Sequence, residues 1–248
     1  SDYSQAYNNA RQKALTTASA LGFQLSPAEL GNPINPADAS SVHQTDPTGQ
    51  NIAEWILNNN PTDQQLQAHL AQIGKINASL PGGQVQSYEQ QLKQQAMNLG
   101  LSNMMLPNNP GGDFFSHAAQ GIIAGTTSLE QQQQILINQA KTNFPAYANQ
   151  LDAGITVKDM AAPYINTLAN LMEVDPTTID LGSSTGYGAM ITNALRGNND
   201  PKNPVPMDLS TFSNQVRSQP QWLNTQNAKT SILDSGTQLL KTFGLDVG

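Results

Sequence analysis

The sequence contains no cysteine among its 248 residues. Disulfide bonds, thiolate metal ligands and a cysteine nucleophile are therefore excluded, and either redox compartment is compatible with the chain. Long apolar runs are missing as well, because stretches such as 121–124 and 135–137 fall far short of the roughly 20 residues that a membrane-spanning helix needs. We expect no membrane span. Residues 1–22 carry charges and no apolar segment, so we do not expect them to form a signal peptide.

Charged residues are scarce, at 12% of the chain, and the formal net charge is -7. Nucleic-acid binding without sequence preference depends on Lys and Arg that neutralise phosphates, so direct contact with nucleic acid is not expected. Asn and Gln together make up about a fifth of the residues. Side-chain amides can hydrogen-bond to a partner's backbone without burying a charge, and this composition therefore favours protein–protein contacts.

Signals for the start of a helix recur along the chain. Ser26, Pro27 and Glu29 combine an N-cap residue, a proline at the first helical position and a glutamate that can bond back to the cap. Variants of this signal occur at Thr62 with Gln65, Ser128 with Gln131, Thr156 with Asp159, and Asp175 with Pro176. These five starts predict at least five helices.

Helix ends and apolar spacing support the same fold class. Gly22, Gly100 and Gly244 each stand between apolar residues, as expected where a left-handed glycine ends a helix and the next side chain packs back. Apolar residues recur at intervals of three and four at Val157, Met160, Ala161, Tyr164, Leu168, Leu171 and Met172. Strand-like alternation is nearly absent, so the sequence predicts an all-α fold.

Two details refine that prediction. Pro163 lies inside the stripe that begins at Val157, and because proline lacks a backbone donor we expect a kink or a break there. A similar stripe follows the last predicted helix, through Ala228, Ile232, Ser235, Leu239 and Phe243.

Clusters of turn residues predict the domain organisation. The densest is Pro-Asn-Asn-Pro-Gly-Gly at 107–112, which we interpret as the joint between helical units 1–110 and 111–248. Residues 32–50 are rich in Pro, Asn and Ser and predict an extended arm. Residues 182–206 contain the turn-rich segments 182–186 (GSSTG) and 197–201 (GNNDP) and predict an irregular loop that is too long for an ordinary connection.

Catalytic and metal sites find little support in the residue patterns. His43, His69 and His117 are scattered without the spacing of metal ligands, so we expect no metal site. Glu54 precedes Trp55 in an apolar segment and resembles a glycosidase acid in a hydrophobic pocket, but no convincing second carboxylate lies nearby in the sequence. We interpret Glu54 as a surface residue beside a core tryptophan and predict no catalytic residues.

Two polar segments also have simpler interpretations than ligand binding. Residues 182–188 are glycine-rich but lack the Gly-Lys-Ser/Thr ending of a phosphate-binding loop and follow no evident strand. Residues 175–180 lack the glycine and glutamate register of a calcium loop, and Asp175 as a helix cap explains more. We expect neither segment to bind a cofactor.

The C-terminal part of the chain resembles a known protein module. The similarity rests on the segments 154–164 (GITVKDMAAPY), 172–175 (MEVD) and 179–180 (ID), followed in the same order by 207–212 (MDLSTF), 219–222 (QPQW), Thr225, 227–228 (NA) and 243–245 (FGL). These segments resemble a module at the C-terminus of minor structural proteins of bacteriophages that infect actinobacteria. Such proteins are tail or internal virion proteins, sometimes accompanied by peptidoglycan-degrading domains. Residues 181–206 depart from the module, and residues 1–110 share no resemblance with it.

The resemblance implies a non-enzymatic virion protein that is assembled in the bacterial host cytoplasm. Its expected partners are other virion proteins and further copies of itself, without a cofactor. Phe212 and Trp222 are interpreted as core anchors that join two short helices, and Tyr164 and Phe243 are further structural or contact candidates. Two alternatives stay open: a virion protein associated with peptidoglycan hydrolysis, with Glu54 as acid, and a cellular helical adaptor.

Overall fold

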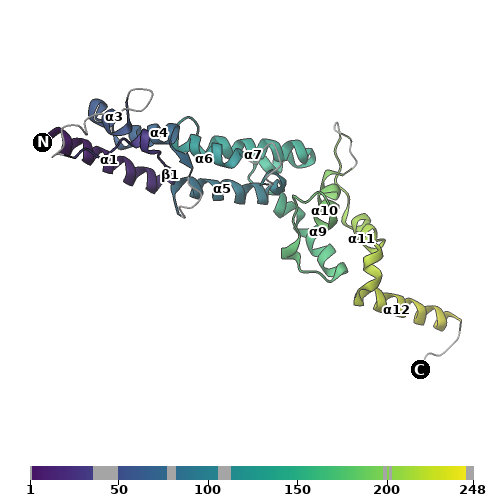
Figure 1. Cartoon of the computed structure of the whole chain (residues 1–248). Helices are drawn as coiled ribbons and strands as arrows, with labels where there is room; N and C mark the ends of the chain where they lie inside the picture. The colour runs from purple at the N-terminus through teal and green to yellow at the C-terminus, as the bar shows by residue number, and fades with distance from the viewer. Residues whose placement is uncertain are drawn as a thin grey trace. The chain divides into compact units, whose positions relative to one another are not determined.

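The computed structural model describes residues 2–35, 50–76, 82–105, 113–197, 200 and 203–243. Helices dominate these residues, and the two strands are two residues long each. The predicted all-α class is therefore confirmed (Figure 1). Within the described ranges, no helix is both long and apolar enough to cross a membrane.

The chain forms two compact units, of which unit 1 comprises residues 1–94 and 110–134. A short antiparallel pairing places Phe23 opposite Ile76 and Gln24 opposite Lys75. The elements of unit 1 are α1 (Asp2–Leu21), β1 (Phe23–Gln24), α2 (Pro27–Leu30), α3 (Ile52–Asn59), α4 (Asp63–Ile73), β2 (Lys75–Ile76), α5 (Gln84–Asn98) as far as residue 94, α6 (Phe114–Ala124) and the beginning of α7 (Leu129–Asn143).

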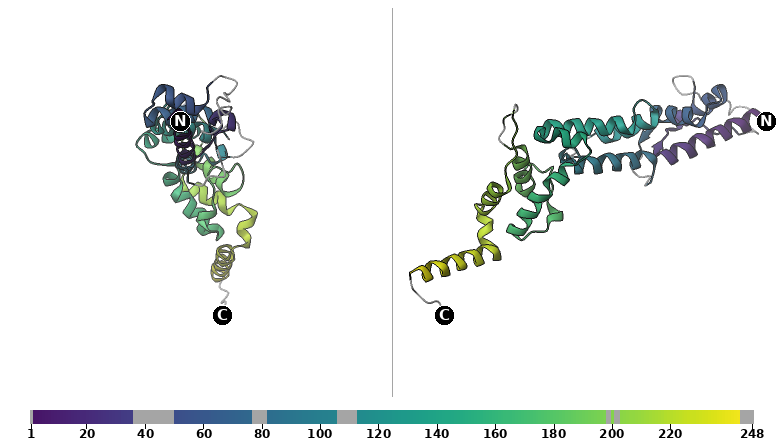
Figure 2. Two further views of the ribbon diagram at one scale, coloured as in Figure 1. Left: turned by 60° about the vertical axis from the view of Figure 1, so that its left-hand side comes forward. Right: turned by 180° about the vertical axis from the view of Figure 1, so that it is seen from behind.

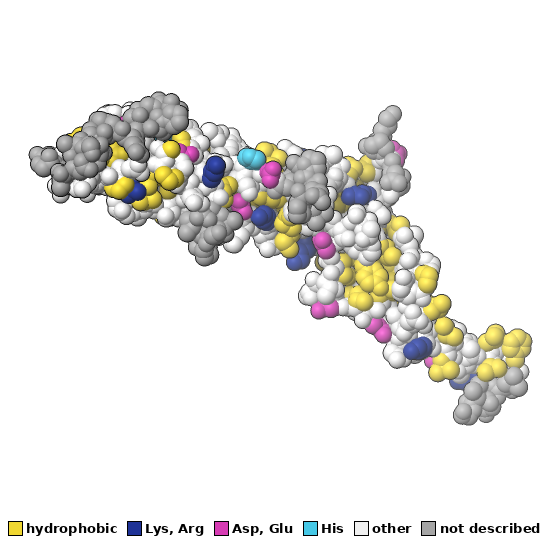
Figure 3. All heavy atoms as spheres, viewed as in Figure 1, with side chains coloured by type: hydrophobic (Ala, Val, Ile, Leu, Met, Phe, Trp, Pro, Cys, Tyr) yellow, Lys and Arg dark blue, Asp and Glu magenta, His cyan; other side chains and the backbone are white. Residues whose placement is uncertain are grey.

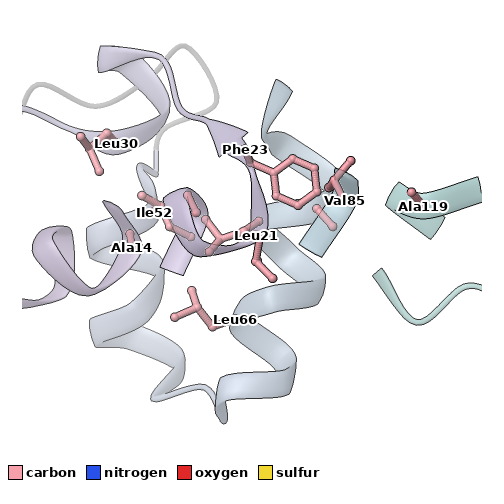
Figure 4. Close-up of a cluster of buried hydrophobic side chains, with 11 residues drawn as sticks. Ala14, Leu21, Phe23, Leu30, Ile52, Leu66, Val85 and Ala119 are labelled. Atoms are coloured by element: carbon pink, nitrogen blue, oxygen red, sulfur yellow. The ribbon is translucent and has the colours of Figure 1, made fainter. Parts of the chain in front are cut away.

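The core of unit 1 lies where α1 meets α3 and α4 and where α4 meets α6. Small residues such as Ala14 and Ala18 lie at the buried face of α1, so that neighbouring helices can approach closely. Larger buried side chains fill the centre, as Figure 4 shows for Leu21, Phe23, Leu30, Ile52, Leu66 and Val85.

Unit 2 comprises residues 95–109 and 135–248. Its main packing joins α9 to α11 and α9 to α10. Besides the ends of α5 and α7, its elements are η2 (Ser102–Met105), η3 (Pro145–Tyr147), α8 (Ala148–Asp152), α9 (Val157–Met172), η4 (Pro176–Thr178), α10 (Gly186–Arg196), α11 (Leu209–Arg217), η5 (Pro220–Asn224) and α12 (Gln226–Thr242).

All five predicted helix starts are confirmed. Ser26, Thr62 and Thr156 each form a reciprocal capping box with the residue three positions later. The backbone N–H of Gln131 donates to Ser128 Oγ, and the side chain of Gln131 accepts from the Ser128 N–H. Asp175 caps the 3-10 helix η4 by accepting from Thr177 N. Each cap pairs N–H groups that a helix start leaves unpaired.

Helix ends follow the predicted chemistry where they are described. Gly22 and Gly100 have φ values of 93° and 68°, the left-handed region that glycine enters without steric cost. Leu101 is buried and its N–H donates to Ala96 O, which completes the predicted C-cap. Gly244, the third predicted end, lies outside the described residues.

Of the kink or break predicted at Pro163, the break is wrong, because α9 runs through this residue from Val157 to Met172. The cost of the missing backbone hydrogen bond is offset by packing on both sides of the proline. Ala161 and Leu168 are fully buried, and Tyr164 is nearly so, so both halves of the helix are held by one core.

The division into units differs from the boundary predicted at residues 110 and 111. Helix α6 packs on α4 in unit 1, and the Gln120 amide donates to the Ala71 carbonyl at 2.6 Å. The breaker cluster at 107–112 lies outside the described residues. Composition could not identify which core the next described helix, α6, joins.

The irregular loop predicted over 182–206 is wrong for residues 186–196, which form α10. Ile191, Ala194 and Leu195 are fully buried along one face of this helix, but glycines at both ends of the segment obscured their helical spacing. Most of the arm predicted at 32–50 falls on 36–49, outside the described residues.

Candidate functional site

Two of the predicted contact residues lie in the core of unit 2. Phe212 on α11 is fully buried, and its ring meets the ring of Tyr164 edge to face, with centroids 5.2 Å apart. The Tyr164 hydroxyl donates to the backbone carbonyl of Met207. These residues fasten α11 and the segment before it to α9, so their role is structural.

A second tyrosine extends this contact. The Tyr147 hydroxyl hydrogen-bonds to that of Tyr164, and burial, together with this neighbour, raises the pKa of Tyr147 to about 12. Burial likewise raises the pKa of Tyr164. Both phenols therefore stay protonated at neutral pH and act as hydrogen-bond donors.

Trp222 on η5 is half-buried. Its indole Nε1 is shielded from solvent and meets no hydrogen-bond acceptor among the described residues. A buried donor without a partner costs free energy, so this position carries a local cost. The interpretation of Trp222 as an anchor between short helices stays a prediction.

Phe243, the fourth predicted contact residue, lies at the surface and is 72% exposed. It continues a row of exposed apolar side chains along α12, where Ile232 is 57% exposed and Leu239 58%. Leu233 and Leu240, which were not part of the predicted stripe, are exposed beside them. We call these five side chains the α12 face; they are Ile232, Leu233, Leu239, Leu240 and Phe243.

The apolar residues of α12 have the same helical spacing as those of α9, but most of them are exposed to solvent, whereas much of the α9 stripe is buried. Ala228 is the buried residue of α12, and every side chain of the α12 face is exposed. In Figure 2 the C-terminal half of α12, coloured yellow, extends beyond the other helices of its unit. Figure 3 shows the hydrophobic side chains gathered over this helix. A contiguous apolar surface of this kind is typical of a protein-interaction site.

The start of α12 is fixed by residues outside the helix. Glu173, at the end of α9, accepts hydrogen bonds from the backbone N–H groups of Gln226 and Asn227 at 3.0 and 2.8 Å. Thr225 accepts from the next one, that of Ala228, at 3.1 Å. The first three N–H groups of the helix are therefore satisfied, and the carboxylate favours the positive end of the helix dipole.

Unit 1 carries a different kind of surface feature. Trp55 and His69 stack with ring centroids 4.0 Å apart and an angle of 7° between the rings, and burial lowers the pKa of His69. The two rings border a shallow cleft of about 350 Å³ whose other lining residues are mostly amides: Asn59, Pro61, Gln65, Ala68 and Gln72. The stack covers one face of the indole, and the amides of Asn59, Gln65 and Gln72 give the cleft neutral hydrogen-bonding groups.

The acidic and metal-binding candidates do not converge on this cleft. Glu54 precedes Trp55 on α3, is half-buried and is not among the residues that line the cleft. Its charge contributes to raising the pKa of Tyr3 and Tyr7, which places it near α1. Across the described ranges, His, Asp and Glu form no group of three that could hold a metal ion.

The glycine-rich segment before α10 has a packing role. A Cβ at Gly188 would collide with the backbone carbonyl of Asp180, so the glycine allows α10 to approach the preceding turn. Asp180 Oδ1 accepts hydrogen bonds from Ser102 Oγ, at 2.5 Å, and from Gly182 N, at 2.9 Å. These contacts account for the segment without a phosphate ligand.

Comparison of the chain with protein-family models, with curated proteins and with solved structures found no match. Of the residues predicted as contacts, Phe243 is the most exposed, and Leu233, Leu240 and Gly236 on the same helix were missed. Their spacing of three and four around Gly236 is the signal that could have identified them.

Proposed function

We propose that this chain acts through protein–protein contacts, as a non-enzymatic structural component of a bacteriophage particle. The α12 face carries the proposal, because five large apolar side chains that are 39 to 72% exposed are suited to cover by a partner. Their burial would be favourable, at about 25 cal/mol for each Å² of apolar surface removed from water.

The amide-rich composition supports the same conclusion. With charged residues at only 12%, contacts between copies or with other proteins desolvate few charges. The assignment to a phage particle, as a minor tail or internal virion protein, depends on the resemblance of residues 154–245 to a module of phage structural proteins. That resemblance includes the buried residues Tyr164 and Phe212 as well as the exposed Phe243.

Quantitative mass spectrometry of purified particles from the source phage tests the proposal. Particles would be compared before and after DNA ejection, with the major capsid protein as the internal standard. Retention in emptied particles identifies a tail or capsid component, and loss on ejection identifies an internal protein delivered with the genome. Absence from both preparations contradicts a virion function.

A further inference from the structure

The apolar residues of the α12 face are spaced symmetrically about Gly236, and this spacing limits which partner the face can bind. Leu233 and Leu239 lie three residues before and after Gly236, and Ile232 and Leu240 lie four residues before and after it. Positions three, four and seven residues from a central residue share one face of a helix. Seven residues from Gly236 stand exposed Lys229 on one side and exposed Phe243 on the other. The face is therefore palindromic about Gly236.

The described part of the chain does not explain Gly236. Among the described residues, a Cβ at this position would meet no atom within 4 Å, and the φ of Gly236 is not in the left-handed region. Glycine is also the least favourable residue inside a helix apart from proline. A residue without a side chain at the centre of an apolar face lets the backbone of a second helix approach closely. The glycine is thus explained by a helix that crosses α12 at this point.

The size of the face is sufficient for two copies to pair. The five side chains are 39 to 72% exposed. At roughly 200 Å² for a large apolar residue, they offer about 600 Å² per chain. Two such faces bury about 1,200 Å² in total, which reaches the lower end of the range for specific protein interfaces.

We propose that the α12 face binds the α12 face of a second copy, antiparallel, about a two-fold axis that passes between the two Gly236 residues. Isologous pairing requires a self-complementary surface, and the palindromic spacing supplies it. Ile232 then faces the partner's Leu239, and Leu233 faces the partner's Leu240, because the residues of each pair lie on the same side of the Gly236 direction and at nearly the same height. Phe243 lies opposite the partner's Lys229, where the ammonium can approach the ring face.

The charged residues of α12 are compatible with this arrangement. Asp234 and Lys241 are two and five residues from Gly236, and this spacing places them on the opposite side of the helix. Both charges therefore stay at the outer surface of the pair. The inference rests on the proposed function, because both use the α12 face for protein contact. It adds a definite partner, a second copy of this chain, and a definite orientation.

Sedimentation equilibrium of the full chain over a range of concentrations tests the pairing. We expect a dimer whose dissociation constant rises about tenfold or more in Leu239→Asp, since the change removes two apolar side chains from the interface and buries two charges. Gln238→Asp adds the same charge to the opposite side of the same helix and should leave the dissociation constant unchanged. A monomer at all concentrations, or equal weakening by both variants, overturns the proposal.

The orientation has a separate test, because the natural chain has no cysteine. Chains with Leu233→Cys and chains with Leu240→Cys are mixed and oxidised, so that only the introduced thiols can form disulfides. Antiparallel pairing brings these two positions together and favours the mixed 233–240 cross-link over 233–233 and 240–240. Preference for the two like cross-links would show parallel pairing and overturn the proposed geometry.

The two proposals can fail independently. A protein that is monomeric in solution but present in purified particles would refute self-pairing and leave the virion function standing, with another virion protein on the α12 face. A dimer that Leu239→Asp disrupts, in a protein absent from particles, would refute the virion function and leave self-pairing standing.

Discussion

Glu173 performs two structural tasks that substitution can separate. It ends α9 in the left-handed conformation, with φ 56° and ψ 43°, and its carboxylate caps the start of α12. Replacement by Ala removes the cap but keeps the unfavourable backbone conformation. Replacement by Gly removes the cap as well, but also relieves the conformational cost, because glycine has no Cβ.

The magnitudes follow from the geometry. Loss of a side-chain cap at a helix start typically costs about 0.5–2 kcal/mol, and because Glu173 is exposed we expect Glu173→Ala to cost about 1 kcal/mol. Relief of the left-handed conformation returns about 1 kcal/mol, so Glu173→Gly should be close to neutral. The two variants should therefore differ in stability even though neither has a carboxylate.

Urea unfolding and amide hydrogen exchange measure the two effects. The free energy of unfolding ranks the variants, while exchange at the backbone N–H groups of Gln226 and Asn227 reports the cap directly. Both variants should accelerate exchange at these two amides. Asp234→Ala, which removes a carboxylate from the exposed side of α12, serves as the control. Equal stability of the Ala and Gly variants would refute the conformational argument, and unchanged exchange would refute the cap.

Three further predictions concern the cores, the aromatic stack and the absence of catalysis. Phe212→Ala should lower the free energy of unfolding by about 3–5 kcal/mol, because it leaves a cavity beside Tyr164; a loss below about 1 kcal/mol in chemical denaturation would contradict the burial. Since burial holds the pKa of native His69 below its value of about 6.5 in the unfolded chain, the unfolded state takes up the proton first as pH falls. Stability should therefore fall from about pH 7.5 to 5.5, and His69→Phe, which keeps a ring on Trp55, should reduce that slope in urea titrations; an unchanged slope would exclude His69 as its source. Purified protein should leave cell-wall peptidoglycan intact in a turbidity assay, and clearing that Glu54→Gln abolishes would instead establish a hydrolase.

The parts of the fold that could be predicted from sequence are those governed by local chemistry. The capping boxes at Ser26 and Thr156 involve residues three positions apart, so their hydrogen bonds are encoded within a single turn. The buried stripe of α9 follows from helical periodicity alone. These features need no knowledge of the rest of the chain.

The parts that could not be predicted depend on contacts between distant segments. The spacing in α12 is as helical as that in α9, but a sequence pattern does not reveal whether a chain covers its own apolar stripe. The stack of Trp55 on His69 joins two helices and leaves no local signal. The same holds for Glu173, whose role as a cap for α12 spans more than fifty residues.

Helix α12 makes stability and recognition separate properties of unit 2. Ala228 is buried and fixes the first turn, whereas the side chains of the α12 face are 39 to 72% exposed and none of them is part of the buried core. Under the proposed pairing, substitutions among them alter what the helix binds while the core around Phe212 and Leu168 is preserved. The end of this chain can therefore acquire a new partner through a few surface substitutions, without the loss of stability that usually accompanies changes to a buried apolar stripe.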